Sequence, residues 1–450
     1  MSGPTTPLRI SVIGCGYLGT VHAVAMAALG HDVVGIDVSG ERIAQLASGE
    51  APFFEPSLPE RLAAGLASGR LRFSTDIGAA ATADLHFVCV GTPQSVGSDA
   101  ADLRALFSAT EALIPHLKPG SVVAGKSTVP VGTAARLSGL VEGAGATLVW
   151  NPEFLREGRA IADSLSPDRI VIGVSAAEGS GRPASAESSG TLDILRQAYA
   201  TMLELGTPLV VTDLPTAELV KGAANAYLAT RISFMNAMAD VAERAGADVV
   251  GLAEALGHDE RIGPHYLRAG IGFGGGCLPK DIRAFAARAT ELGAAAPAAL
   301  LAQVDEINLG QRARIVEAVA EHFGGSVVGR RVTVLGAAFK PESDDIRDSP
   351  AIDIARELHR LGSILTLTDP AALPNVAGRY PELGLEASLD DALRDADCLI
   401  LATEWAEYRQ LDPARAATLV ASRTVFDGRN CLDREAWSAA GWKYRGIGRR

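Results

Sequence analysis

One cysteine of the chain stands in a setting that favours reactivity. Cys277 follows the run GFGGG at residues 272–276 and directly precedes LPKD, in which Pro279 suits the first turn of a helix. Thiols at a helix N-terminus and beside a cation, here Lys280, ionise more readily than ordinary thiols. Because the glycine run offers no side chains that would bury the sulfur, we interpret Cys277 as a candidate nucleophile rather than a core residue.

Polar side chains elsewhere in the chain could assist such a nucleophile. Lys221 and Asn225 are four residues apart in a helical pattern and therefore share a face. A lysine in that apolar stretch could be desolvated and stabilise an oxyanion, or could be an ordinary solvated charge. Glu153 and Glu157 follow a strand-like segment and offer either two catalytic carboxylates or the capped start of a helix. Asp281 could simply complement the dipole of the helix that follows Cys277.

A glycine-rich turn near the N-terminus indicates a dinucleotide site. GCGYLG at residues 14–19 fits G-x-G-x-x-G between a strand-like segment and a helical one, and Asp37 closes the next strand-like segment about 20 residues later. Such glycines let backbone N–H groups approach a pyrophosphate at a helix N-terminus. Asp37 would hold the ribose hydroxyls and repel a 2′-phosphate, which favours NAD over NADP; a plain packing turn is the alternative. The cofactor residues expected in this turn are Gly14, Gly16, Tyr17, Leu18 and Gly19.

Strand-like runs and polar loops alternate through the first 200 residues. The predicted strands cover residues 8–13, 32–37, 85–90, 122–126, 148–150 and 169–174, with a helix at 20–29. Polar loops follow the third and fourth of them, at the strand ends where open α/β sheets bind ligands. Residues 176–190, rich in Ser, Gly and Ala, show no periodicity and are predicted to form a surface loop. We expect an N-terminal Rossmann domain over residues 1–200.

The middle of the chain is predicted to be helical, and the strand pattern then returns. Helical patterns cover residues 215–245, 278–292 and 298–323, the first of them longer than typical globular helices. Strands are expected at 332–335, 364–368 and 398–402, with a helix at 350–361. The predicted fold class is therefore α/β: two Rossmann-type doubly wound domains joined by a long central helix and a helical middle domain. The expected boundaries are 213–323 for the middle domain and 328–450 for the C-terminal one.

Composition narrows the classes of partner. The 450 residues carry a net charge of −12 with no long basic run, which argues against nucleic acid as a partner. No apolar run is long enough for a membrane span, and no signal peptide is evident. The cysteines show no metal-ligand spacing, so we expect no metal and a reducing cytoplasm. They are scattered along the chain, and Cys89 and Cys398 lie in apolar strand-like segments typical of core residues.

Seven motifs together resemble those of the nucleotide-sugar 6-dehydrogenases, and the resemblance covers essentially the whole chain. Family members are similar in their organisation, with two Rossmann-type domains joined by a long dimer-forming helix. One departure is Gly276, where many relatives have Ser directly before the nucleophile. The motifs stand in the order GCGYLG (14–19), VGTP (90–93), KSTVPVGT (126–133), NPEFLREG (151–158), AELVKGAANAYLATRISFMN (217–236), RIGPHYLRAGIGFGGGCLPKD (261–281) and AFKPESDDIRDSP (338–350).

The resemblance implies a reaction and a role for each matching residue. The family oxidises a sugar CH2OH at C6 to a carboxylate with two NAD+, through an aldehyde and a thioester on one cysteine, which water then hydrolyses. Cys277 matches that nucleophile. Lys221 would stabilise oxyanions, Asn225 would support the C6 oxygen, Thr128 and Asp281 would position water or accept a proton, and Glu153 would act as base in hydrolysis.

The resemblance also implies binding residues and partners: NAD as cofactor, UDP-glucose as the small-molecule substrate, and a homodimer in which Arg261 reaches the substrate of the partner subunit. Cofactor contacts are expected from Asp37, Arg42, Thr92, Thr128, Glu157, Lys280 and Arg347. Substrate contacts are expected from Glu153, Phe154, Leu155, Lys221, Asn225, Arg261, Tyr266, Leu267, Arg268, Ala269, Gly270, Gly274, Phe339 and Lys340.

Three alternatives stay open at this point. GDP-mannose or another UDP-hexose could replace UDP-glucose, since no residue reads the nucleobase on physical grounds. A hydroxyacid dehydrogenase with a single oxidation shares the N-terminal domain and a lysine-bearing helix but needs no cysteine. A non-catalytic nucleotide-sugar binder would have no need of the nucleophile Cys277.

Overall fold

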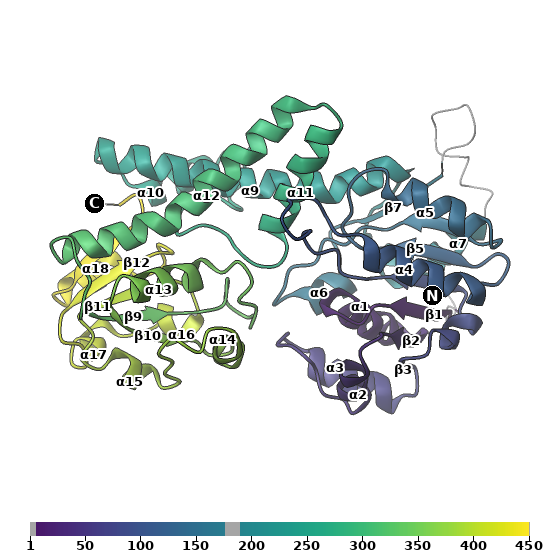
Figure 1. Ribbon diagram of the computed structural model, residues 1–450, viewed down its shortest axis with the longest axis horizontal. Helices are drawn as coiled ribbons and strands as arrows, with labels where there is room; N and C mark the ends of the chain where they lie inside the picture. Colours follow the sequence, from purple (N-terminus) through teal and green to yellow (C-terminus); the bar gives the residue numbers. More distant parts are fainter. Residues whose placement is uncertain (1–5, 176–189, 450) are drawn as a thin grey trace. The chain divides into compact units, whose positions relative to one another are not determined.

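The computed structural model describes residues 6–175 and 190–449, which form two compact units, Met1–Ala224 and Asn225–Arg450. The predicted loop at residues 176–190 lies outside the described residues, except for Gly190, which begins a helix. Each unit contains one sheet with helices on both faces (Figure 1). The described chain is therefore mixed α/β, with a Rossmann-like domain in each unit, as the sequence predicts.

The first unit is built on a sheet whose strand order is β3-β2-β1-β4-β5-β6-β7-β8 among the described residues. All pairings are parallel except β6 with β7, which is antiparallel. The order of β1 to β6 is that of dinucleotide-binding sheets, with its switch point between β1 and β4. The strands are β1 (Arg9–Ile13), β2 (Asp32–Ile36), β3 (Leu71–Ser74), β4 (Leu85–Val88), β5 (Val122–Gly125), β6 (Thr147–Trp150), β7 (Ile170–Val174) and β8 (Leu209–Asp213).

Alternate residues of these buried strands face opposite layers of helices. Val122 and Ala124 of β5 belong to one apolar cluster with α1 and α6, while Val123 between them belongs to another with α4 and α5. This period of two is what a parallel sheet covered on both faces requires. The helical elements are α1 (Tyr17–Ala28), α2 (Gly40–Ala47), α3 (Leu58–Ala67), η1 (Ile77–Thr82), α4 (Arg104–Leu113), η2 (Ile114–His116), α5 (Thr133–Glu142), α6 (Ala160–Leu165), α7 (Gly190–Ala198) and α8 (Ala200–Glu204).

Long helices make up the middle of the chain. The helix α9 (Leu214–Ala245) begins in the first unit and ends in the second, close to the predicted limits 215–245, and Gly246 follows it with φ +72°. In the second unit, α11 packs against α12, and both contribute to an apolar cluster with α9. The other helices here are α10 (Val249–Gly257), α11 (Leu278–Glu291) and α12 (Ala295–His322).

The second sheet has the strand order β10-β9-β11-β12-β13, and all its pairings are parallel. This is the other common doubly wound order, with its switch point between β9 and β11. The strands are β9 (Arg331–Leu335), β10 (Ile364–Thr368), β11 (Cys398–Leu401), β12 (Thr424–Asp427) and β13 (Lys443–Gly446). The helices are α13 (Pro350–Arg360), α14 (Leu373–Arg379), α15 (Leu389–Leu393), α16 (Ala406–Arg409), α17 (Pro413–Ala416) and α18 (Arg434–Ala439).

The predicted elements are present, with shifts at their ends. Two starts differ most: α12 begins at Ala295 rather than at residue 298, and α1 begins at Tyr17 rather than at residue 20, because Gly16 already serves as the N-cap of α1. The strand predicted at 85–90 ends at Val88, where the chain turns into the VGTP loop. Strands β3, β8, β12 and β13 had no sequence prediction. The strands β3, β8 and β13 lie at sheet edges and are only partly buried, whereas β12 is buried but has only four residues.

Candidate active site

The glycine turn of the first unit forms a cradle of backbone at the start of α1. Gly14 has φ +90°, and a Cβ on Gly19 would lie 1.7 Å from the Gly14 carbonyl oxygen, so this helix and turn can approach only without side chains. A Cβ on Gly16 would meet nothing within 4 Å. The backbone at Gly16 is therefore open at a helix N-terminus, the geometry that accepts a phosphate.

Asp37 lies beside this turn, just after the end of β2. Its Oδ2 accepts the backbone N–H of Cys15 at 2.8 Å and pairs with Arg42 Nη1 at 3.2 Å. The structure thus brings the predicted cofactor residues Asp37 and Arg42 together at the edge of the glycine turn. A carboxylate held in this way can receive ribose hydroxyls.

The loop after β5 brings Thr128 next to Thr92. The Thr92 hydroxyl donates to the Thr128 carbonyl at 2.6 Å, so two predicted contacts on the nicotinamide side are joined. The far end of the loop is fixed by Glu218 of α9, a buried carboxylate that accepts the N–H groups of Gly132 at 2.7 Å and Ala134 at 2.6 Å. Glu218 lies one turn before Lys221 on the same helix. Glu218 was not predicted from the sequence, although its position three residues before Lys221 places it on the same face of the helix.

Glu153 and Lys221 form a shielded ion pair within the first unit. Glu153 Oε1 lies 2.9 Å from Lys221 Nζ, with exposed side-chain fractions of 12% and 6%. The second oxygen of Glu153 accepts the N–H of Leu155 at 2.6 Å, and Phe154 lies with its ring centroid 5.9 Å from the ammonium. Of the two sequence interpretations of Lys221, the solvated charge is therefore wrong: the ammonium is buried against a carboxylate.

The end of the NPEFLREG loop is held by Glu55, which sequence reasoning also missed. Its carboxylate accepts the N–H groups of Gly158 and Ala160, both at 2.7 Å, and the hydroxyl of Tyr17 from the glycine turn. The helix α6 begins only at Ala160, so Glu153 and Glu157 lie in a loop and not in a capped first turn. No sequence signal distinguishes Glu55 from a surface glutamate, because its partners lie 38, 103 and 105 residues away along the chain.

In the second unit, Cys277 is the N-cap residue of α11 and is exposed. Asp281 lies in the first turn of this helix with only 4% of its surface exposed. Its two oxygens accept hydrogen bonds from Asn225 Nδ2 of α9 and from Lys280 Nζ, both at 2.7 Å. The structure therefore groups an exposed thiol with a carboxylate, an amide and an ammonium, and Asp281 does more than complement the helix dipole.

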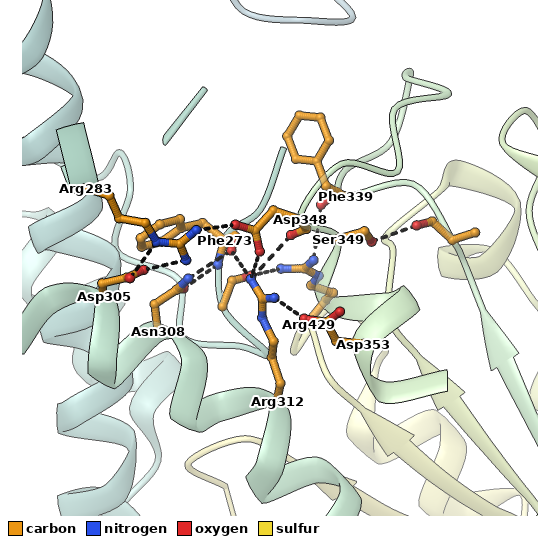
Figure 2. Close-up of polar contacts among 12 residues, drawn as sticks. Phe273, Arg283, Asp305, Asn308, Arg312, Phe339, Asp348, Ser349, Asp353 and Arg429 are labelled. Carbon is orange, nitrogen blue, oxygen red and sulfur yellow. Dashed lines mark hydrogen bonds and ion pairs between the residues drawn. The ribbon is translucent and has the colours of Figure 1, made fainter. Parts of the chain in front are cut away.

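The loop before Cys277 is fixed by polar side chains from α12 and the C-terminal sheet (Figure 2). Asn308 of α12 accepts the N–H of Phe273 at 2.7 Å and donates to its carbonyl at 3.0 Å. Arg429, which follows β12, donates to the Gly272 carbonyl at 2.8 Å. A Cβ on Gly274 would lie 2.2 Å from the Asp348 carbonyl oxygen, so the loop and the 339–349 segment pack backbone to backbone.

Two arginines extend this network. Arg312 of α12 is buried and pairs with Asp348 at 2.8 Å and with Asp353 of α13. Arg283 of α11 pairs with the same Asp348 at 3.0 Å and with Asp305 at 2.7 Å (Figure 2). Asp348 has φ +48°, a conformation that its two arginine partners hold in place. These ion pairs join the helix that Cys277 caps to the C-terminal domain.

Part of the predicted substrate segment lines a cavity of about 360 Å³ in the second unit. Tyr266, exposed and with φ +61°, precedes this part, whereas Arg261 is exposed and paired with its neighbour Asp259. Phe339 and Lys340 are half-buried, with the ammonium 5.2 Å from the ring centroid. Arg347 is largely exposed and paired with Asp345. The cavity is lined by Leu267, Arg268 and Ala269 together with Arg409, Arg429 and Asn430.

No group of three or more His, Cys, Asp or Glu side chains in residues 6–175 and 190–449 could hold a metal ion. No described helix combines the length and the apolar character needed to cross a membrane.

Comparison with protein families adds to this geometry. Residues 8–187, 215–309 and 333–434 match, in turn, the NAD binding, central and UDP binding domains of the UDP-glucose/GDP-mannose dehydrogenase family. The chain is 38% identical over 449 residues to a UDP-glucose 6-dehydrogenase of Rhizobium meliloti, covering 98% of this chain and 100% of that one. It is 37% identical over 458 residues to the Pseudomonas aeruginosa UDP-glucose 6-dehydrogenase, covering 98% of each.

Solved structures are similar as well. A UDP-glucose dehydrogenase from Pyrobaculum islandicum superposes with a TM-score of 0.86 at 35% identity, with all of both chains covered. A UDP-D-ManNAc dehydrogenase from Pyrococcus horikoshii gives a TM-score of 0.83 at 26% identity, with 98% of this chain and 99% of that chain covered.

Proposed function

Because the chain belongs to the UDP-glucose/GDP-mannose dehydrogenase family, and is an NAD-dependent oxidoreductase of that family, we propose that it oxidises UDP-glucose at C6 to UDP-glucuronate. The observation that carries the proposal is the exposed thiol of Cys277 at the start of α11, beside the buried Asp281–Asn225 pair. A protein that only bound a nucleotide sugar would need no such thiol.

The glycine turn fits NAD. Its open backbone at Gly16 suits the pyrophosphate, while Asp37 suits the adenosine ribose and disfavours a 2′-phosphate. Bound NAD+ would supply the acceptor for the hydride in each of two oxidations. The further cofactor contacts proposed from the resemblance are Arg42, Thr92, Thr128, Glu157, Lys280 and Arg347.

The proposed chemistry on Cys277 balances in four steps. The C6 carbon loses a hydride and its hydroxyl group loses a proton, which gives an aldehyde. The Cys277 sulfur adds to the aldehyde carbon, and the oxygen takes up a proton to give a thiohemiacetal. Loss of a second hydride and a proton gives a thioester on Cys277. Water then cleaves the C–S bond, which releases the carboxylate and returns the thiol.

The charged residues have matching proposed roles. Lys221, shielded and already paired with Glu153, would stabilise negative charge on the C6 oxygen. Glu153 would take the proton of the hydrolytic water, with Thr128 and Asp281 positioning water or accepting a proton. Asn225 would support the C6 oxygen; it lies one helical turn after Lys221 on α9.

We place the diphosphate of the substrate at the cavity lined by Arg268, Arg409 and Arg429, because cations must neutralise a diphosphate. Tyr266, Gly270, Gly274, Phe339 and Lys340 would complete this site, and Phe154 and Leu155 would contact the sugar end of the substrate.

We propose a division of the chain into three domains, at residues 1–200, 213–323 and 328–450. A cytoplasmic location fits a reactive thiol, and none of the five cysteines is in a disulfide.

We further propose a homodimer formed through α9. Tyr227, Phe234 and Val241 recur every seven residues on this helix and are 62%, 50% and 55% exposed. A stripe of large apolar side chains at this spacing is typical of a helix that packs against another helix. Arg261 would then reach the substrate bound by the neighbouring copy. Phe234→Glu should give monomers in sedimentation analysis. Val328→Glu, a matched change at an exposed position outside α9, should leave the dimer intact. A dimer of the Phe234→Glu variant would overturn the proposed interface.

The experiment that tests the function is NADH release from limiting UDP-glucose. Two NADH per sugar support the four-electron oxidation; one would indicate a single oxidation and remove the role of Cys277. GDP-mannose and other UDP-hexoses are the alternative substrates within the same family. Turnover of GDP-mannose without turnover of UDP-glucose would overturn the substrate proposed here.

A further inference from the structure

The first unit contains a buried lysine to which the proposed reaction assigns no role. Lys126 follows β5 and begins the loop that carries Thr128, and only 7% of it is exposed. Within the part of the chain that the structure describes, no carboxylate oxygen lies within 4.0 Å of its ammonium. An ammonium without a salt bridge in a protein interior is costly, so its retention calls for a physical reason.

The ammonium is held by one amide oxygen and two aromatic rings. Lys126 Nζ donates to Asn151 Oδ1 at 2.9 Å and to the Tyr199 hydroxyl at 3.4 Å. It also lies 5.5 Å from the ring centroid of Phe87 and 6.0 Å from that of Tyr199, within the range of cation–π attraction. The Tyr199 hydroxyl donates to the same Asn151 oxygen at 2.5 Å, so two donors converge on one acceptor.

Asn151 connects Lys126 to the loop that carries Glu153. Its backbone N–H donates to the Gly125 carbonyl of β5 at 2.8 Å, and its Nδ2 donates to the Val171 carbonyl of β7 at 2.8 Å. Asn151 is thus fixed across the sheet at the point where the NPEFLREG loop leaves β6. Glu153, two residues later, is the partner of Lys221.

A small cavity of about 60 Å³ adjoins both groups. Lys126, Asn151, Glu153 and Tyr199 all line it, so the two charged residues border the same space, and their charges interact. The charge of Lys126 therefore acts on Glu153 through a poorly screened interior, although the two form no direct ion pair.

We propose that Lys126 is a positioning residue for hydrolysis of the thioester: its buried ammonium fixes Asn151 and thereby holds Glu153 where it can activate water. This inference rests on the proposed function, in which Glu153 is the base of the last step. Lys126 touches neither substrate nor cofactor in this proposal and acts through Asn151.

The surroundings of Lys126 make its charge sensitive to pH. Burial lowers the pKa of Lys126 to about 8, and interactions with Cys89, which follows β4, and Glu153 partly oppose that shift. The other titratable groups that face it are Tyr199, whose pKa burial raises, and His22 of α1, whose pKa is lowered by burial and then by Lys126 itself. As pH rises through about 8, the ammonium becomes an amine and its hold on the Asn151 oxygen weakens.

The test compares Lys126→Met with Tyr199→Phe in the full-length protein. Methionine keeps the length of the side chain and removes the desolvated charge, so this variant should fold. Tyr199→Phe removes the other donor to the same Asn151 oxygen and no charge, which makes it the matched control. The first readout is hydrogen exchange of the backbone amides of residues 151–158. We expect exchange at least about tenfold faster in Lys126→Met and close to wild type in Tyr199→Phe.

The second readout separates hydrolysis from oxidation. With UDP-glucose and excess NAD+, Lys126→Met should release two NADH per site in a burst at the wild-type rate, then turn over at least about tenfold more slowly. An acid quench should show a sugar adduct accumulating on Cys277. In wild type, the steady-state rate should fall as pH passes about 8, and this inflection should be absent in Lys126→Met.

Unchanged exchange at residues 151–158 in Lys126→Met would overturn the inference whether or not UDP-glucose is the substrate. Equal slowing of the burst and of the steady state would overturn it too, since that pattern indicates a general structural role. Absence of NADH release by the wild-type protein would instead count against the proposed function, and the exchange measurement would still decide the role of Lys126.

Discussion

The two sheets begin with the same local geometry and use it differently. After β1, Gly14 has φ +90° and donates its N–H to the Ile36 carbonyl at the end of β2; after β9, Gly336 has φ +103° and donates to the Thr368 carbonyl at the end of β10. An aspartate follows the second strand in each case, Asp37 in the first unit and Asp369 in the second. Each aspartate accepts backbone N–H groups from the turn after the first strand.

The two carboxylates differ in what remains available to a ligand. The Asp37 side chain is 9% exposed and accepts hydrogen bonds from the N–H groups of Cys15 and Ser39 and from Arg42, whose own side chain is 41% exposed. Asp369 is 4% exposed, and its oxygens are occupied. Its donors are the N–H groups of Ala337, Ala338, Ala371 and Ala372 and the indole N–H of Trp405.

The difference shows that the same strand-and-turn geometry can form a ligand site in one doubly wound domain and support a neighbouring loop in another. In the first unit the turn continues into glycines and α1, which leaves backbone open to a pyrophosphate. In the second, Phe339 follows the turn, and residues 339–349 run instead to the glycine loop before Cys277, where Gly275 donates its N–H to the Arg347 carbonyl at 2.9 Å. One turn is an open ligand site, and the other supports the nucleophile loop.

The largest effect should come from Cys277, the thiol that follows the glycine loop supported by the second turn. Cys277→Ala should lower steady-state NADH formation by about a thousandfold or more, because no thioester can form. The matched control is Cys398→Ala, since Cys398 is buried in β11 and burial raises the pKa of its thiol to about 12. Steady release of two NADH per sugar by Cys277→Ala would contradict the assignment.

Asp369→Asn should destabilise the turn after β9, because the Asp369 carboxylate accepts the N–H groups of Ala337 and Ala338 in that turn. The amide presents an NH2 where N–H donors converge, and we expect the free energy of unfolding to fall by about 3 kcal/mol. The corresponding drop in Tm, measured by calorimetry, is about 10 °C for a unit of this size. Asp390→Asn at an exposed site should change the unfolding free energy by less than about 0.5 kcal/mol. Equal stabilities of the two variants would mean that the buried carboxylate has no structural role.

Asp37→Asn should affect binding rather than stability. We expect the KM for NAD+ to rise by about 30-fold, with kcat little changed and discrimination against NADP+ reduced, because the charge facing the ribose is removed. Initial rates at varied cofactor concentration measure this. Folded Asp369→Asn protein serves as the comparison and should keep its KM for NAD+. A large change in Tm for Asp37→Asn with an unaltered KM would reverse the assignment of the two turns.

Gly276→Ser should have the smallest effect. A Cβ at Gly276 would lie 2.3 Å from the guanidinium carbon of Arg347, but this side chain is 57% exposed and can move away. We expect kcat within about threefold of wild type. Gly275→Ala is the contrasting change: Gly275 has φ +89°, and its Cβ would meet the Phe339 ring at 2.8 Å, so loss of activity should be greater. The reverse order would show that the contact between Gly276 and Arg347 matters more than the backbone packing.

Short-range sequence patterns were enough to predict the local features of this protein. The glycine turn with Asp37, the long helix over residues 214–245 and the start of α11 directly after Cys277 follow from short-range patterns. These features depend on residues within one or two helical turns, which is the range over which spacing and capping rules act. The same holds for the family motifs, because each is a contiguous segment.

Which charges are buried, and which groups hold them, follows from the three-dimensional packing. Glu55 meets the N–H of Gly158 across 103 positions, and Lys221 meets Glu153 across the NAD-binding unit. Whether a lysine such as Lys126 or an aspartate such as Asp369 is solvated depends on the side chains that surround it in space. The free energy of a buried charge is set by those distant partners, and spacing along the chain carries no information about them.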